Sequence, residues 1–269
     1  MSTLFTGISE LRTVSERGTL NDAAIIAQSG TIAWVGPASE APAADEKVDL
    51  GGRAVLPGWV DSHTHMVFDG DRSAEFEARI SGGSYEAGGI AVTMDATRQA
   101  GTDRLDKLVA DRVAAGRRGG TTTFETKTGY GLNTESEVEA AKVASRHVDD
   151  VTFLGAHLVP PGADAEEYLD EVVGPMLEGV APYVQWIDVF CERGAFNEEQ
   201  SRRVLEAGKK LGLGLRVHGN QLGVGPGVAL AVELGAASVD HVNHLTDEDV
   251  ELLANSDTVA TMLPACDLS

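Results

Sequence analysis

Two histidines one residue apart, His63 and His65, follow an apolar segment that predicts a β-strand. Because successive side chains of a strand alternate between its two faces, both imidazoles would project to the same side. Two imidazoles on one side can bind one divalent transition metal ion. An ordinary pair of surface or core histidines produces this pattern equally often, so the metal interpretation depends on further ligands elsewhere in the chain.

A third histidine, His218, closes another apolar segment. As a third ligand from across the fold it would leave one metal position open for water, which is typical of catalytic rather than structural sites. A metal ion lowers the pKa of bound water, so that hydroxide is available near neutral pH. The alternative is a histidine whose ring nitrogens are satisfied by hydrogen bonds at the end of a strand.

Two further residues suit such a site. His241 ends the next apolar segment and would act as a general base or proton shuttle beside the water. The alternative is a buried histidine that is hydrogen-bonded to the backbone. Arg72 follows the histidine pair by seven residues and would hold a substrate carboxylate through two parallel hydrogen bonds. A lone arginine in a loop is more often a surface charge, and only the nearby histidines favour the binding role.

A glycine-rich loop at 126–131 carries Tyr130, whose hydroxyl is available to a ligand that the glycines allow to approach closely. The alternative is an ordinary turn with a packing aromatic ring.

Cys191 ends another apolar segment, and we expect it to be a small buried side chain rather than a nucleophile. The chain has no G-x-S-x-G motif, which argues against a serine hydrolase.

These residues stand at the ends of regularly spaced apolar segments. The expected strands are at 54–60, 121–125, 151–155, 186–191, 214–217, 237–240 and 258–263. Amphipathic helices are expected between most of them, at 105–116, 135–147, 165–178, 197–211, 225–234 and 247–254. This alternation predicts an α/β protein with a parallel sheet.

The position of the polar residues distinguishes two α/β architectures. Nearly every strand ends in a reactive side chain, whereas a doubly wound sheet would gather such residues at one switch point. The pattern therefore favours a TIM-like (β/α)₈ barrel. Seven strands are recognised where a barrel has eight, so we expect either an unrecognised strand or a barrel that is incomplete at its C-terminus.

Residues 1–53 predict short strands and turns, with a hairpin around Ser29-Gly30. We expect this segment to form the N-terminal part of a small β-sandwich-like domain, and 54–269 to form the barrel. Because so small a β-segment can hardly bury a core of its own, we expect it to pack on the rest of the chain.

Composition narrows the possible partners. The formal net charge of −21 opposes binding to nucleic acid or to an anionic membrane, because both require a basic surface. We therefore expect neither nucleic acid nor a membrane as a partner. Two cysteines are too few for a disulfide scaffold, and no signal peptide or 18-residue apolar stretch is evident. These features favour the cytoplasm.

Taken together, the motifs resemble the amidohydrolase superfamily and, within it, the imidazolonepropionases. The resemblance rests on LPGWVDSHTHMVFDGDR at 56–72, ISGGSYE at 80–86, GGTTTFETKTGYGL at 119–132, FLGAHLVPP at 153–161, DVFCERGAF at 188–196, LRVHGNQL at 215–222 and ASVDHVNHL at 237–245. The histidine pair is shared across the superfamily, whereas the combination of DGDR, KTGYGL, GAHLVPP and FCERGAF is far more specific.

The resemblance implies hydrolysis of 4-imidazolone-5-propanoate to N-formimino-L-glutamate, a step of histidine degradation, on a single zinc or iron ion. The matching metal ligands are His63, His65 and His218. The residues that match substrate-binding positions are Arg72, Tyr130, His157 and Gln221. His241 matches the histidine that assists the attacking water, and Lys127 and Gly129 would only shape their loop.

The resemblance also implies a fourth metal ligand, an aspartate at the end of an eighth strand, which the sequence does not reach. It further implies a homodimer. Two alternatives stay open from the sequence. One is another metal-dependent cyclic amidohydrolase or deaminase on the same barrel, and the other is an inactive truncated fragment. A shared fold does not decide the substrate, so the substrate assignment depends on the specific segments.

Overall fold

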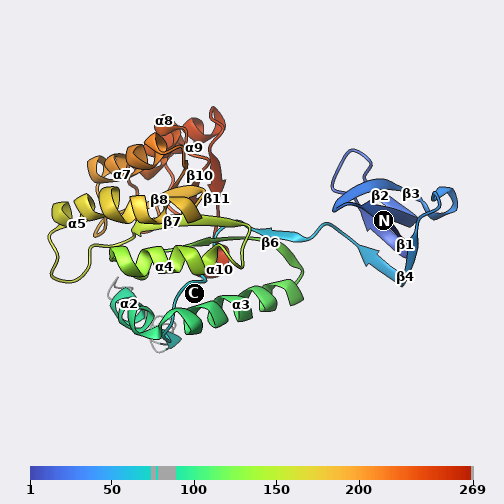
Figure 1. Cartoon of the computed structure of the whole chain (residues 1–269). Helices are drawn as coiled ribbons and strands as arrows, with labels where there is room; N and C mark the ends of the chain where they lie inside the picture. The colour runs from blue at the N-terminus through green and yellow to red at the C-terminus, as the bar shows by residue number, and fades with distance from the viewer. Residues whose placement is uncertain (74–76, 78–88, 268–269) are drawn as a thin grey trace. The chain divides into compact units, whose positions relative to one another are not determined.

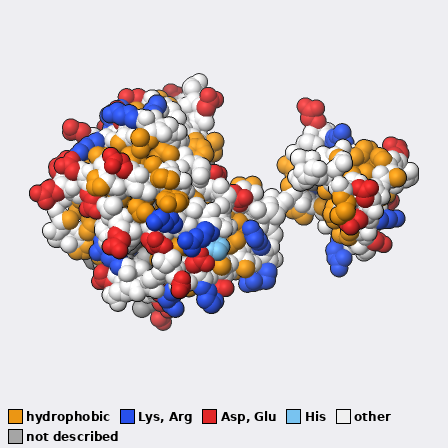
Figure 2. Space-filling view, in the orientation of Figure 1, with side chains coloured by type: hydrophobic (Ala, Val, Ile, Leu, Met, Phe, Trp, Pro, Cys, Tyr) orange, Lys and Arg blue, Asp and Glu red, His pale blue; other side chains and the backbone are white. Residues whose placement is uncertain are grey.

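The computed structural model describes residues 1–73, 77 and 89–267, so the quoted segment at 80–86 lies outside the described residues. Contacts divide the chain into two compact units, Met1–Trp59 and Val60–Ser269. No helix in the described part of the chain is both long and apolar enough to cross a membrane. On the face shown in Figure 2, acidic and basic side chains are interspersed over both units.

The N-terminal unit is a four-stranded sheet in the order β3-β2-β1-β4. Its strands are β1 (Ser2–Arg12), β2 (Thr19–Gln28), β3 (Thr31–Pro37) and β4 (Glu46–Val55), with a 3₁₀ turn at Ala38–Glu40. The predicted hairpin is confirmed, because β2 and β3 pair antiparallel. Ser29 and Gly30 at its tip have φ of 52° and 78°, the left-handed backbone that two-residue hairpin turns require.

The larger unit contains, within the described residues, a seven-stranded sheet whose order follows the chain from β5 to β11. Its strands are β5 (Trp59–Asp61), β6 (Thr121–Lys127), β7 (Asp150–Ala156), β8 (Trp186–Cys191), β9 (Gly214–Gly219), β10 (Ser238–His241) and β11 (Val259–Thr261). The pairs from β6 to β11 are parallel. The α/β barrel class is thereby confirmed as an incomplete barrel, with β5 and β11 as its edge strands.

The first expected barrel strand, at 54–60, is divided between the two units. Ala54 and Val55 end β4, which pairs with β1, and the barrel strand begins only at Trp59. Pro57 separates the two because proline has no N–H to donate to a sheet. The apolar run therefore serves two sheets rather than one.

Helices connect the strands and cover the sheet (Figure 1). They are α2 (Gly89–Ala100), α3 (Thr102–Arg118), α4 (Thr134–Ala144), α5 (Ala165–Glu171), α6 (Leu177–Val180), α7 (Glu198–Lys210), α8 (Gly227–Leu234), α9 (Asp247–Ala254) and α10 (Pro264–Asp267), with a π-helical turn at Val172–Met176 and a 3₁₀ turn at Ala181–Tyr183. The sequence analysis did not identify α2.

The single helix expected at 165–178 is interrupted between α5 and α6. Gly174 has non-helical angles of φ −106° and ψ −111°, and Pro175 follows it. Proline removes a helical hydrogen bond and clashes with the preceding turn, which explains the break. By contrast, α7 begins at the predicted Asn197, whose side chain forms a capping box with Gln200.

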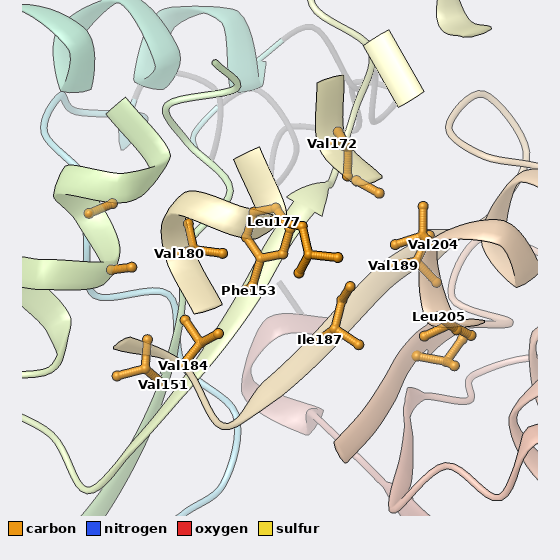
Figure 3. Packing of buried hydrophobic residues seen from close by; sticks show 14 of the residues in the cluster. Val151, Phe153, Val172, Leu177, Val180, Val184, Ile187, Val189, Val204 and Leu205 are labelled. Carbon is orange, nitrogen blue, oxygen red and sulfur yellow. The ribbon is translucent and has the colours of Figure 1, made fainter. Parts of the chain in front are cut away.

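The core lies between the sheet and these helices (Figure 3). Ile187 and Val189 of β8 are fully buried beside Leu205 of α7 in this apolar cluster. Each such side chain contributes roughly 1.5–3 kcal/mol of burial free energy. Because strand side chains alternate, the residues between them, such as Asp188, project to the opposite face, toward the inside of the barrel. Packing on the outer face therefore fixes which polar side chains enter the interior.

Candidate active site

One pocket of the larger unit, of about 280 Å³, collects every residue that the sequence analysis selected for the site. Its lining includes His63, His65, Arg72, Tyr130, His157, His218, Gln221 and His241. These residues follow the carboxyl ends of successive parallel strands, which converge at one end of a barrel. A larger pocket of about 420 Å³ in the N-terminal unit is lined by no histidine or carboxylate, so we assign the chemistry to the first.

Three imidazoles form a cluster in this pocket. The nitrogens that His63, His65 and His218 offer lie within 4.8 Å of one another. The Nε2 atoms of His65 and His218 are 3.4 Å apart. Nε2 of His63 and Nδ1 of His65 are buried and have no hydrogen-bond partner among the described residues. A buried imidazole nitrogen without a partner, beside nitrogens of two further imidazoles, fits a metal ion, which would use their lone pairs.

Electrostatics favour the metal-binding form of these rings. Burial, followed by the nearby Lys127 and His218, lowers the pKa of His63 far below its ordinary value. Burial also lowers the pKa of His65, and neighbouring histidines add to this effect. Both rings are therefore neutral, and neutral imidazole is the form that binds metals. With the carboxylate of Asp240 beside His63, the cluster is a His/Asp metal-binding group.

The backbone around the histidine pair is held by the neighbouring strand. β5 ends at Asp61, so His63 and His65 lie just beyond it rather than within it. Thr64 between them donates its N–H to Oε2 of Glu125 at 3.1 Å, and its carbonyl accepts the N–H of Lys127 at 2.9 Å. These bonds extend the pairing with β6, and the two rings stay close, with centroids 5.3 Å apart.

Two buried carboxylates stand behind the cluster. Nδ1 of His63 lies 2.6 Å from Oδ2 of Asp240, and Nδ1 of His218 lies 3.0 Å from Oδ2 of Asp188. Oδ1 of Asp188 also accepts the backbone N–H of His218 at 3.2 Å. A carboxylate at the far nitrogen of a metal-binding histidine sets its tautomer and orients its ring.

Lys127 lies among these carboxylates, at the end of β6. Its Nζ is 3.0 Å from Glu125, 3.2 Å from Asp188 and 3.7 Å from Asp240. Burial by itself lowers the pKa of Lys127, but the three carboxylates outweigh this effect and the pKa is raised. Burial raises the pKa of Asp188, yet His218 and Lys127 reverse the shift and lower it well below its usual range. Lys127 and Asp188 are therefore both charged.

The sequence analysis had assigned Lys127 to shaping the loop and had not selected Asp188 or Asp240. The available signal was alternation: Glu125 and Lys127 are two residues apart and share a face of β6, as Asp188 does with Phe190 on β8. Charged residues on the inner face of a strand are rarely buried without partners. Which partners they meet depends on three strands that are distant in sequence.

The other side of the pocket contains an aromatic group. The ring of His157 is stacked on His65 at 5.5 Å and lies 5.4 Å from the ring of Tyr130. Nδ1 of His157 is 2.9 Å from the carbonyl oxygen of Gly129. Because a carbonyl only accepts, this Nδ1 carries the proton and leaves Nε2 as an acceptor. Burial, and then His218, lowers the pKa of His157 to about 4.

The loop that carries Tyr130 is anchored by a single buried carboxylate. Glu137 of α4 accepts the backbone N–H groups of Gly129, Gly131 and Leu132 at 2.9, 2.7 and 2.9 Å. Gly129 has φ of 106°, and a Cβ there would lie 2.6 Å from the carbonyl oxygen of Leu154. A glycine is therefore required at this position.

Glu137→Gln is expected to loosen this loop, because an amide nitrogen cannot accept the N–H groups that the carboxylate holds. Leaving buried donors unsatisfied costs about 1–3 kcal/mol. We expect the free energy of unfolding, measured by urea denaturation, to fall by this amount while the protein still folds. Stability equal to that of the unaltered chain would contradict the anchoring role.

His241 and Gln221 complete the lining. The ring of His241 lies 5.3 Å from that of His63 and 5.2 Å from that of His218. His241 has φ of 79°, a left-handed conformation that is costly for a residue with a Cβ and is commonest at functional sites. The side-chain amide of Asn243 donates to the carbonyl of Gln221 at 3.3 Å.

Two solved structures with the same fold are distantly related to this chain in sequence. A triazine hydrolase from Arthobacter aurescens matches 99% of this chain and 66% of its own with a TM-score of 0.69 and 17% identity. A Xaa-Pro dipeptidase with bound methionine matches 97% of this chain and 66% of its own with a TM-score of 0.66 and 16% identity. These likenesses show a shared barrel fold, and in this chain a His/Asp group lies at the strand ends of that fold.

Comparison with known sequences gives a narrower assignment. No family model matches the chain. The imidazolonepropionase of Arthrobacter sp. (strain FB24) is 62% identical over all of this chain and 70% of its own length. That of Saccharopolyspora erythraea is 64% identical over all of this chain and 69% of its own, and that of Streptomyces coelicolor is 53% identical. The chain belongs to the imidazolonepropionase family.

Proposed function

We propose that the chain hydrolyses the cyclic amide 4-imidazolone-5-propanoate to N-formimino-L-glutamate. The observation that carries this proposal is the convergence of three imidazoles with Arg72 and Tyr130 in one pocket. The family of the chain supports the choice of substrate. Incubation with this substrate and with a panel of other cyclic amides, followed by mass spectrometry of the products, tests it. Turnover of another cyclic amide but not of this one would overturn the proposal.

His63, His65 and His218 would hold the metal ion, which supplies a Lewis acid and a water of lowered pKa. Water adds to the ring carbonyl carbon, and the bond from that carbon to the ring nitrogen breaks. His241 takes the proton from the water and returns it to the departing nitrogen. Three imidazole ligands suit either zinc or iron, and we propose one of these two. Elemental analysis of the purified protein distinguishes them.

The remaining lining residues would bind and orient the substrate. Arg72 pairs with the propionate, and the hydroxyl of Tyr130 reaches the same end of the substrate. Nε2 of His157 accepts a hydrogen bond from a ring N–H, since its Nδ1 proton is committed to Gly129. Gln221 contacts the imidazolone through its side-chain amide. The charge of Arg72 and of the metal would attract the anionic substrate despite the acidity of the whole chain.

Arg72→Ala is expected to raise KM by about tenfold to a hundredfold, because a hydrogen bond between charged groups contributes about 1.5–3 kcal/mol to binding. We expect kcat to change little, because this contact would act equally in the ground state and the transition state. Steady-state kinetics measure both constants. Arg104→Ala is a matched control, since Arg104 is an exposed arginine that pairs with Asp69, three residues before Arg72. An unchanged KM in Arg72→Ala would contradict the propionate role.

We also propose that the protein acts in the cytoplasm as a homodimer. The cysteine usage of the sequence and its resemblance to dimeric family members support these two points. Light scattering of the purified chain would measure its mass in solution, and a monomer at micromolar concentration would contradict the dimer. Cell fractionation with an antibody to the chain would test the location.

A further inference from the structure

The buried ion cluster behind the histidines has a specific arrangement. The ammonium of Lys127 contacts two carboxylates, and each of these contacts a different imidazole of the metal group. Asp188 contacts His218, and Asp240 contacts His63. Lys127, Asp188 and Asp240 have no exposed surface at all. Through these carboxylates, a single cation therefore links the two chain segments that carry the three histidines, one after β5 and the other at the end of β9.

A purely structural role would not require this connectivity. A buried ion pair rarely stabilises a fold more than well-packed apolar side chains of the same volume. The inner face of the barrel has another buried cation, Arg216, which stacks on Trp186 at 4.4 Å and donates to the carbonyl of Ser62. The contacts of Arg216 hold the backbone and an aromatic ring, whereas those of Lys127 lead to the histidines.

We propose that Lys127 is a positioning residue for the metal group, and that its ammonium holds Asp188 and Asp240 in the orientation that directs the rings of His218 and His63 toward the ion. This inference rests on the proposed function, because it needs a metal on the three histidines. Lys127 itself touches neither substrate nor metal. Its effect reaches the ion only through the two carboxylates.

The consequence of removing the ammonium follows from charge and geometry. Asp188 and Asp240 would face each other without a cation between them, and Oδ1 of Asp240 already lacks a hydrogen-bond partner among the described residues. At least one carboxylate would turn away or take up a proton. The imidazole in front of it would then lose the acceptor that fixes its tautomer. Loss of such an outer contact typically weakens metal affinity by about 10- to 100-fold.

The experiment measures metal affinity without any turnover. Lys127→Met keeps the length of the side chain and removes its charge. Zn²⁺ affinity is measured on the full chain by competition with a chromophoric chelator, and the visible spectrum of the Co²⁺-loaded protein reports the geometry around the ion. We expect Zn²⁺ affinity to fall by about 10- to 100-fold and the Co²⁺ bands to change in position and intensity. Asp188→Asn and Asp240→Asn should each change the spectrum in the same way.

Glu137→Gln is the matched control. Glu137 is also a fully buried carboxyl group, but it holds the loop of Tyr130 rather than the three histidines of the metal group. We expect this variant to lose stability while its Zn²⁺ affinity and Co²⁺ spectrum stay those of the unaltered chain. A change of the same size in Glu137→Gln would mean that general destabilisation explains the result, and would overturn the proposal.

If Lys127→Met does not fold by circular dichroism, the double variant Glu125→Gln/Lys127→Met removes one of the carboxylates left without a cation. Failure of both variants to fold would assign Lys127 to the fold and overturn the positioning role. Unaltered Zn²⁺ affinity and Co²⁺ bands in a folded Lys127→Met would overturn only this inference. Absence of Zn²⁺ binding by the unaltered chain would overturn the proposed function as well.

Discussion

His218→Ala should eliminate stoichiometric metal binding and hydrolysis together. The side chain of His218 reaches the centre of the cluster, with its Nε2 3.4 Å from that of His65. Two imidazoles alone hold a divalent ion poorly, because catalytic sites of this kind use three protein ligands. A Lewis-acidic ion contributes several kcal/mol, so kcat/KM should fall by about 10³-fold or more. Elemental analysis and steady-state kinetics measure the two effects on the same preparation.

The control for this change is His244→Ala. His244 is exposed, and its backbone N–H and carbonyl both form hydrogen bonds with Asn220. We expect this variant to keep its metal and its activity. If His218→Ala retained one ion per chain, the assignment of His218 as a ligand would be wrong.

His241→Asn should lower kcat by about 10²- to 10⁴-fold, the usual contribution of a general acid or base, and leave the metal content unchanged. Asparagine is a better replacement than alanine here. The φ of 79° at His241 lies in the left-handed region, which asparagine tolerates more readily than other residues with a Cβ. The substitution therefore removes the imidazole with little added backbone strain.

The result separates two roles for His241. Its ring lies as near to His63 and His218 as those rings lie to other members of the cluster. A base acts on the water and leaves the ion in place, whereas a ligand would release it. Loss of metal from His241→Asn would therefore contradict the proton-transfer role.

Much of this architecture can be predicted from local patterns. Short apolar runs separated by helical patterns indicate buried strands, and these runs placed the strands from β6 to β11 to within a few residues. The capping residue Asn197 and the turn at Ser29-Gly30 act within four residues of chain, so their signals are complete in the sequence. Histidines that follow several parallel strands indicate a common site, because those strand ends converge.

Other features depended on contacts that no local pattern contains. The apolar run at 54–60 was predicted as one strand, yet β1 captures its first residues and the barrel takes its last ones. Pro57 marks where the run can divide, but pairing with strands far away along the chain decides which sheet each part joins. The break at Gly174, by contrast, has a local signal in Pro175, which helical periodicity alone does not report.

Residue type and spacing along the chain were sufficient to select His63, His65 and His218 as a candidate metal group, because two-residue periodicity and strand-end position are local properties. They did not pair Lys127 with Asp188 and Asp240. Those three come from β6, β8 and β10, and their ammonium and carboxylates meet only when the curved sheet brings its inner face together. Ion pairing inside a barrel is a property of tertiary packing, since each partner alone would be a costly buried charge.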